Sequence, residues 1–282
     1  MKSSIYYKTK NIAFNTLIHV FLLSVAVTCI FPLLWMVLAS LKTQETIFKD
    51  FSLIPREFHF ENYYTAWVQG GFGRYFLNSI FYTAAVVFGI VIVSSMAAYA
   101  FSRLKFPGRS FLFYMLMAAM MIPLPGSFVP LFVLMTKLRL LNTEIGYILC
   151  MINVGLSTSI FLLKTFFDKM PKELEDAARI DGCSKLGIWW NVALPLSKPV
   201  LAVVVIFNAL NVWNEYILAL LLFNDKLKMP LQVAIVRFHG EFITQYPLLM
   251  AGLTITAIPI ILAYLAMQKY IIKGVTQGAL VG

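Results

Sequence analysis

The side chains best able to do chemistry gather in one hydrophilic stretch, residues 164–198. Five of the 13 Asp and Glu residues of the chain fall between Asp168 and Asp181. Pro171 suits the first turn of a helix, whose positive N-terminal end favours the acidic side chains that follow. Gly182 predicts the end of that helix, because glycine readily adopts positive φ. The stretch therefore predicts a short helix and a glycine turn that could dock against another protein.

A second short helical segment, 184–192, follows the glycine turn and carries Trp189 and Trp190. Residues 164–198 would then form a helix, a glycine turn and a second helix that project into water. The small side chains of Ala177 and Ala178 would let the surface of another protein approach closely. The alternative is an amphipathic loop that lies at a membrane interface, with the two tryptophans as anchors. The residues alone leave both interpretations open.

A second group of polar side chains interrupts long apolar runs. Asn208, Asn211 and Glu215 follow i, i+3, i+7 spacing, which places them on one face of a helix. Such groups could line a polar pathway through a membrane, or they could join helices to one another. The outer interface of a membrane is a further alternative for Glu215. The candidates of this kind are Asn153, Ser157, Asn208, Asn211, Asn214 and Glu215.

Catalytic and metal-binding patterns are missing from the sequence. The three histidines lie far apart, and the three cysteines form no Cys-x-x-Cys pair, so a metal site is not expected. There is no phosphate-binding P-loop, no G-x-S-x-G and no H-E-x-x-H. We expect no catalytic residue and no bound cofactor, and the sequence does not predict an enzyme.

The composition indicates a membrane protein that crosses the bilayer several times. Hydrophobic residues make up 60% of the 282 residues, against about 45–50% in a soluble domain. Charged residues make up only 13%, and a soluble fold of this size could not bury so much apolar surface. Disorder is excluded because disordered chains are poor in apolar residues. Three cysteines are too few for a disulfide scaffold.

Long runs without Asp, Glu, Lys or Arg, one of them interrupted by Glu215, mark the elements that must position these groups. A helix needs about 20 residues to cross the hydrocarbon core, and the runs show none of the alternation of a barrel strand. The first run is also too long for a signal peptide. We predict an all-α fold with six transmembrane helices, at about 12–41, 75–102, 110–136, 145–163, 199–223 and 247–268. The tails would be 1–11 and 273–282, around a transmembrane domain 12–272 that includes the loop 164–198.

The basic residues predict the orientation of these spans. Of the 23 Lys and Arg residues, 14 lie before the first span, after the last span, or in the second and fourth loops. Basic loops stay on the cytoplasmic side, so both termini are expected in the cytoplasm. The net charge of +10 is then explained by topology. No basic run with interleaved aromatic residues predicts nucleic-acid binding.

The loop 164–198 resembles the EAA motif of ABC-importer permeases, E-A-A-x3-G-x9-I-x-L-P. Asp176-Ala177-Ala178 is followed by three residues and Gly182, and nine residues later by Val192, one residue and Leu194-Pro195. The spacing matches throughout, with Asp176 in place of Glu and Val192 in place of Ile.

The resemblance extends over nearly the whole chain, to the permeases of maltose-type carbohydrate importers. Other matching stretches are PLLW at 32–35, SLK at 40–42, ENY at 61–63, FLNS at 76–79, AAYAFSR at 97–103 and WNE at 213–215. The C-terminal GALVG is similar to the family's Gly-Ala-Val-Lys-Gly ending but lacks the lysine.

The resemblance implies a type I ABC-importer permease in the prokaryotic cytoplasmic membrane. The expected partners are a second, different permease, two copies of an ATPase subunit that binds ATP and magnesium, an extracytoplasmic sugar-binding protein and a carbohydrate. The residues expected to couple the chain to the ATPase are Glu175, Asp176, Ala177, Ala178, Asp181, Gly182, Val192, Leu194 and Pro195. Alternating access would move the sugar. In the maltose type the other permease chain makes most of the sugar contacts, so the polar residues of the spans are candidates for the pathway.

A stand-alone secondary transporter or channel is the alternative function. It would predict ion-coupled flux and an inverted repeat between the two halves. The halves show no such repeat, and the loop 164–198 would have no role in it.

Overall fold

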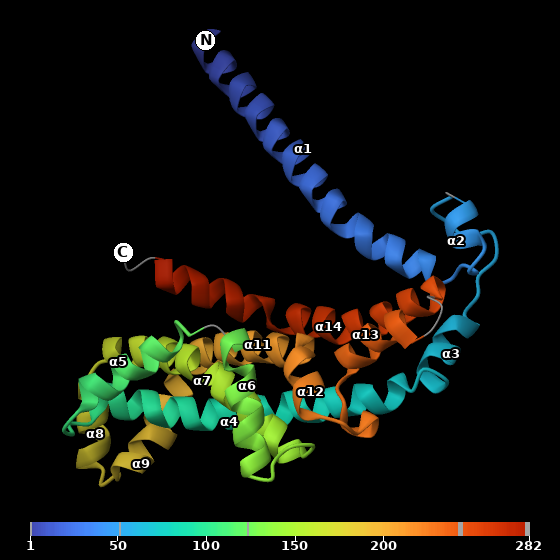
Figure 1. The fold of residues 1–282 in the computed structure, drawn as a ribbon. Helices are drawn as coiled ribbons and strands as arrows, with labels where there is room; N and C mark the ends of the chain where they lie inside the picture. The colour runs from blue at the N-terminus through green and yellow to red at the C-terminus, as the bar shows by residue number, and fades with distance from the viewer. Residues whose placement is uncertain (1, 51, 123, 242–244, 280–282) are drawn as a thin grey trace. The chain divides into compact units, whose positions relative to one another are not determined.

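The computed structural model describes residues 2–50, 52–122, 124–241 and 245–279, and over these ranges the secondary structure is helical without a strand (Figure 1). The chain divides into two compact units, Met1–Gly70 with Phe238–Ile255, and Gly71–Arg237 with Thr256–Gly282. The all-α prediction is therefore confirmed for the described residues.

The first unit contains α1 and the turn that follows it. Its helices are α1 (Lys2–Ala39), α2 (Thr46–Lys49) and α3 (Glu61–Val68), with the end of α13 (Leu231–Glu241) and the start of α14 (Tyr246–Ala279). The side chains of α1 are exposed from Phe14 to Trp35. A helix that is apolar on every side requires lipid or a protein partner to cover it, as expected of a span.

Two of the stretches that carry the family resemblance contact each other in this unit. The Asn62 amide donates to the backbone carbonyls of Ser40 and Lys42 at 2.8 and 3.0 Å, and the Ser40 and Tyr63 hydroxyls are 2.7 Å apart. The SLK and ENY residues therefore close the turn after α1, because they satisfy backbone carbonyls that the end of a helix leaves free.

The second unit is built on α4 (Phe72–Arg103) and α7 (Glu144–Lys169), which pack along each other. Their facing side chains, with Tyr82, Ile90, Tyr147 and Leu163 fully buried, form the core of this unit. The other helices are α5 (Arg109–Ala119), α6 (Leu124–Lys137), α8 (Glu173–Ile180), α9 (Lys185–Ile188), α10 (Leu194–Leu196), α11 (Lys198–Asn214) and α12 (Ile217–Leu222). A π-helix, η1 (Trp189–Ala193), and a 3₁₀ turn, η2 (Lys226–Lys228), complete it with parts of α13 and α14.

The N-terminal end of α4 holds the segment around η2. The Asn78 amide donates to the carbonyls of Leu227 and Met229 at 2.8 and 3.0 Å. The Ser79 hydroxyl accepts the backbone N–H of Leu231 at 2.8 Å. The FLNS stretch therefore fixes a loop that lies far from it in sequence.

The length and polarity of the described helices support four spans directly. Phe14–Ala39, Phe72–Arg103, Glu144–Lys169 and Tyr246–Gln268 are long and apolar enough to cross a membrane. They correspond to the first, second, fourth and sixth predicted spans. A bent pair, Lys185–Leu196 with Lys198–Asn214 at 79°, would give a fifth. The predicted count of six is thus not reached by unbroken helices.

Two of the predicted spans are broken helices. The span predicted at 110–136 is divided into α5 and α6, and the chain turns at Met120–Ile122. This break lies beside the prolines of that run, which lack the backbone donor a helix requires; Pro123 itself lies outside the described residues. The span predicted at 199–223 ends as α11 at Asn214 and resumes as α12.

Candidate functional site

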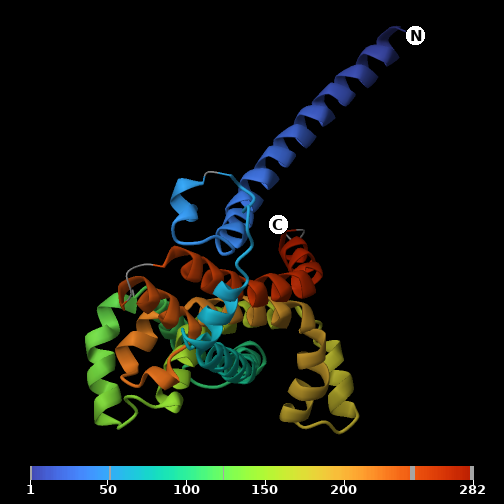
Figure 2. The ribbon, with the colours of Figure 1, turned by 90° about the vertical axis from the view of Figure 1, so that its right-hand side faces the viewer.

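The segment that follows α7 forms a helix, a glycine turn and a second helix. The backbone N–H groups of Asp181, Gly182 and Cys183 close the end of α8, bonding to the carbonyls of Ala177, Arg179 and Ala178 at 2.9–3.0 Å. Gly182 has φ of +82°, a conformation that costs other residues strain. The Ser184 hydroxyl then caps α9 by accepting the N–H of Gly187 at 3.1 Å. Figures 1 and 2 show α8 and α9 as a pair that projects from one end of the second unit.

The outward face of this pair is apolar at its tip. Ile180 is 87% exposed, and Leu174, Ala177 and Leu186 are also exposed. Leu174, Ala177 and Ile180 are spaced by three residues, so they share one side of α8. Among the predicted coupling residues, five are exposed: Asp176, Ala177, Asp181, Gly182 and Pro195.

The inward face of the pair packs onto the second unit. Glu175 and Ala178 are buried, and Val192 and Leu194 are partly buried against the core. The two alanines of the motif therefore have different environments. Ala177 faces outward, whereas Ala178 faces the core, because successive helical residues point about 100° apart.

A buried ion pair fixes the inward face. Nε of Arg103, the last residue of α4, lies 2.9 Å from Oε1 of Glu175, and the side chains are 7% and 5% exposed. Nη2 of Arg103 also donates to the carbonyls of Phe167 and Met170 at the end of α7. The Tyr99 hydroxyl lies 3.5 Å from Oε2 of Glu175. Three helices are thereby joined at one guanidinium.

Sequence reasoning did not assign a role to Arg103 or Ile180. Arg103 belongs to the AAYAFSR stretch, which supports the family resemblance but does not indicate which residue Arg103 contacts. Ile180 was available as an apolar residue directly before the Asp181-Gly182 turn. Its spacing of three residues from Leu174 and Ala177, which continues their apolar side of the helix, is the signal that could have identified it.

Two of the polar residues in the spans hold helices together. The Asn208 amide donates to the Ser159 hydroxyl at 3.0 Å, which joins α11 to α7. The Glu215 carboxylate accepts the N–H groups of Leu218 and Ala219, and it also accepts the Tyr147 hydroxyl at 3.2 Å. Glu215 thus satisfies the first N–H groups of α12, where the helix is broken.

The other four polar candidates have different positions. Asn153 and Asn211 are exposed, and Ser157 is half-buried. Asn214 is exposed, and its side-chain oxygen accepts the Gln232 amide at 3.2 Å. Lining of a substrate pathway stays a prediction for all six residues, and exposure leaves Asn153 and Asn211 the most available for it.

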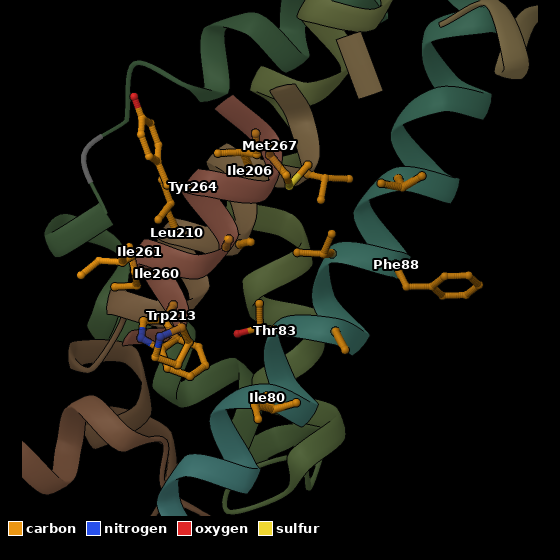
Figure 3. A pocket seen from close by; sticks show the side chains of 17 residues that line it. Ile80, Thr83, Phe88, Ile206, Leu210, Trp213, Ile260, Ile261, Tyr264 and Met267 are labelled. Atoms are coloured by element: carbon orange, nitrogen blue, oxygen red, sulfur yellow. The ribbon is translucent and has the colours of Figure 1, made fainter. Parts of the chain in front are cut away.

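The second unit also contains a wide apolar groove between α4, α11 and α14 (Figure 3). Its volume is about 780 Å³. Thr83, Trp213 and Tyr264 are the lining residues with polar side-chain atoms, and the Trp213 indole already donates to the carbonyl of Thr256 at 3.2 Å. A sugar needs several polar partners for its hydroxyls, so this groove is not suited to a carbohydrate. Within the described ranges, no group of three or more His, Cys, Asp or Glu side chains could hold a metal ion.

Comparisons with known proteins point to one kind of protein. Residues 89–277 match the family described as binding-protein-dependent transport system inner membrane component. The diacetylchitobiose uptake system permease protein NgcG of Streptomyces coelicolor is 34% identical over 94% of this chain and 88% of its own length. The arabinooligosaccharides transport system permease protein AraQ of Halalkalibacterium halodurans is 34% identical over 92% of this chain and 93% of its own.

A solved structure has the same fold as this chain. It is described as the crystal structure of a bacterial ABC transporter involved in the import of the acidic polysaccharide alginate. The TM-score is 0.82 at 26% identity, over 91% of this chain and 96% of the matched chain.

Proposed function

Because the chain belongs to the family of binding-protein-dependent transport system inner membrane components, as a permease of the carbohydrate ABC importers, we propose that it is coupled to its ATPase through α8 and α9. The observation that carries the proposal is the projecting pair of helices itself. Ile180 is exposed at its tip, and the buried Arg103–Glu175 ion pair holds it against the second unit. An apolar side chain in a surrounding polar rim is typical of the centre of a protein interface.

The energy source would lie in a separate subunit. This chain carries no P-loop, so ATP and magnesium would be bound by the ATPase, in two copies. Closure of the two ATPase subunits would displace α8, and the permease would alternate between inward-facing and outward-facing states. An extracytoplasmic binding protein would deliver the sugar to this chain and a second permease, in the cytoplasmic membrane of a prokaryote.

The substrate would be a carbohydrate. The names of two relatives support this class, since they specify diacetylchitobiose and arabinooligosaccharides. Asn153, Ser157, Asn211 and Asn214 would provide amide and hydroxyl partners for the sugar hydroxyls. Asn208, Asn214 and Glu215 already have protein partners in the structure. Asn208 and Glu215 are also less exposed than Asn214, which supports a packing and capping role for these two beside the pathway.

A pull-down in mild detergent tests the proposal. The chain is tagged at its N-terminus, purified from its native membrane, and its partners are identified by mass spectrometry. We expect a second permease and a P-loop ATPase, with two ATPase copies in the intact mass of the complex. Recovery of the chain alone would contradict the proposal and would favour an ion-coupled secondary transporter.

The cargo is identified with the same complex in vesicles. Radiolabelled diacetylchitobiose, arabinotriose and maltotriose are offered with the binding protein on the outer side and ATP on the other. Uptake that requires both supports an ATP-driven importer. Uptake that continues without ATP but stops when an ion gradient is removed would contradict it.

A further inference from the structure

The guanidinium of Arg103 is the point at which three helices meet at one end of the second unit. Arg103 is the last residue of α4, and its Nε lies 2.9 Å from the carboxylate of Glu175 in α8. Its Nη2 donates to the carbonyls of Phe167 and Met170, where α7 ends. Carbonyls at the end of a helix carry its negative partial charge, which favours a cation there. One planar group therefore ties α8 to both α4 and α7.

Because the Arg103–Glu175 ion pair is buried, separating its two charges is energetically unfavourable. Both side chains are less than a tenth exposed, and the Tyr99 hydroxyl occupies the other side of the carboxylate. Rotation of α8 against α4 or α7 would leave a buried charge without its partner, and such a charge is strongly unfavourable. By contrast, the nearby Lys164–Asp168 ion pair is partly exposed and lies within α7, and Asp168 contacts α4 by accepting the Ser102 hydroxyl at 2.7 Å.

We propose that Arg103 is a positioning residue that makes α8 move as one rigid body with the ends of α4 and α7. Displacement of α8 by the ATPase then reaches the membrane-spanning helices instead of being absorbed by the loop. Lysine cannot replace Arg103, because an ammonium lacks the extended planar group whose Nε lies beside a carboxylate while its Nη2 donates to two carbonyls. The inference rests on the proposed function, since it takes α8 as the surface on which the ATPase acts.

The test measures one distance within this proposed rigid body. Spin labels are attached at Lys105→Cys and Glu173→Cys, exposed positions just after α4 and at the start of α8, and Cys29, Cys150 and Cys183 are replaced by alanine. The distance is recorded in the assembled complex without nucleotide and after trapping with MgATP and orthovanadate. We expect a narrow distribution whose mean differs by less than about 2 Å between the two states. A larger shift in this otherwise unaltered chain would overturn the inference.

The decisive variant removes the charges without leaving one of them buried. Arg103→Met combined with Glu175→Leu replaces the pair by apolar side chains, an exchange that often preserves stability. We expect this variant to assemble with the ATPase, but with a distance distribution that broadens or shifts on trapping. A distribution as narrow as that of the parent chain in both states would show that the pair only stabilises the fold.

Two further variants keep the test decisive. If the double variant assembles poorly, Arg103→Lys takes its place. We expect the distance distribution to broaden in this variant as well. A distribution as narrow as that of the parent chain would count against the inference. Lys164→Gln removes the exposed pair of α7 and should leave the distribution unchanged; equal broadening in this control would overturn the assignment to Arg103. If no ATPase is recovered with the parent chain, the proposed function is contradicted. If an ATPase is recovered and the distance distribution stays narrow in every variant, only this inference is contradicted.

Discussion

The side-chain amide of Asn208 fills the space that a Cβ atom at Gly155 would need. The same amide donates to Ser159, one turn further along α7. The bare backbone at Gly155 therefore allows α11 to approach α7 closely, and Asn208 closes the contact with a hydrogen bond. Close approach at small residues combined with a polar bond is a common way for helices to associate in membranes.

We expect Gly155→Ala to destabilise the second unit. A methyl group there would overlap the Asn208 amide and Ile90, and overpacking of this kind costs about 1–3 kcal/mol. Thermal unfolding of the purified complex in detergent should show a lower midpoint. Gly126→Ala is the matched control, because a Cβ at Gly126 has no atom within 4 Å. Equal midpoints for the two variants would contradict the close contact.

Asn208→Leu and Asn211→Leu should have different consequences. Asn208 joins two helices, and loss of such a bond costs about 0.6–2 kcal/mol, so this variant should reduce the recovery of assembled complex. Asn211 is exposed, so its replacement should lower the uptake of the identified carbohydrate while recovery stays unchanged. If Asn211→Leu impairs assembly as much as Asn208→Leu does, Asn211 is a packing residue.

Gly182→Ala should weaken binding of the ATPase. An alanine at this positive φ costs about 1–2 kcal/mol, and the strain would disturb the turn between α8 and α9. Gly108→Ala is the matched control, since Gly108 has a similar φ of +78° and both positions are open around the Cβ. The amount of ATPase recovered per permease should fall for Gly182→Ala only. A similar fall for both would mean that the effect arises from strain alone.

Ile180→Asp should remove most of the bound ATPase without affecting the fold. Ile180 is 87% exposed, so the change costs little within the chain, whereas a central apolar contact at an interface is worth about 2 kcal/mol or more. Leu227→Asp, on an exposed residue of η2, provides the control. The measurement is the affinity of purified ATPase for the permease in nanodiscs. Unchanged affinity for Ile180→Asp would exclude the tip of α8 from the interface.

Much of the fold could be predicted from the sequence because its causes are local. The length of an apolar run decides whether a helix can span a membrane, and four long helices lie where such runs occur. The turn at Gly182 is also local, since positive φ at that position depends on the residue itself. The breaks in the third and fifth predicted spans were harder to locate. Prolines lie beside the break in the third span. The break in the fifth span depends on a tertiary contact, in which Glu215 caps α12 and accepts the Tyr147 hydroxyl.

The tertiary structure alone decided which faces and partners these residues have. Ala177 and Ala178 are equivalent in the motif, yet one faces outward and the other inward, because α8 is oriented by a contact with α4. Arg103 and Glu175, like Asn208 and Ser159, belong to segments far apart in the chain. Their pairing depends on how α4, α7 and α11 pack, which spacing along one helix does not specify. Local patterns therefore determined the elements and the presence of the projecting loop, and packing determined how that loop is held.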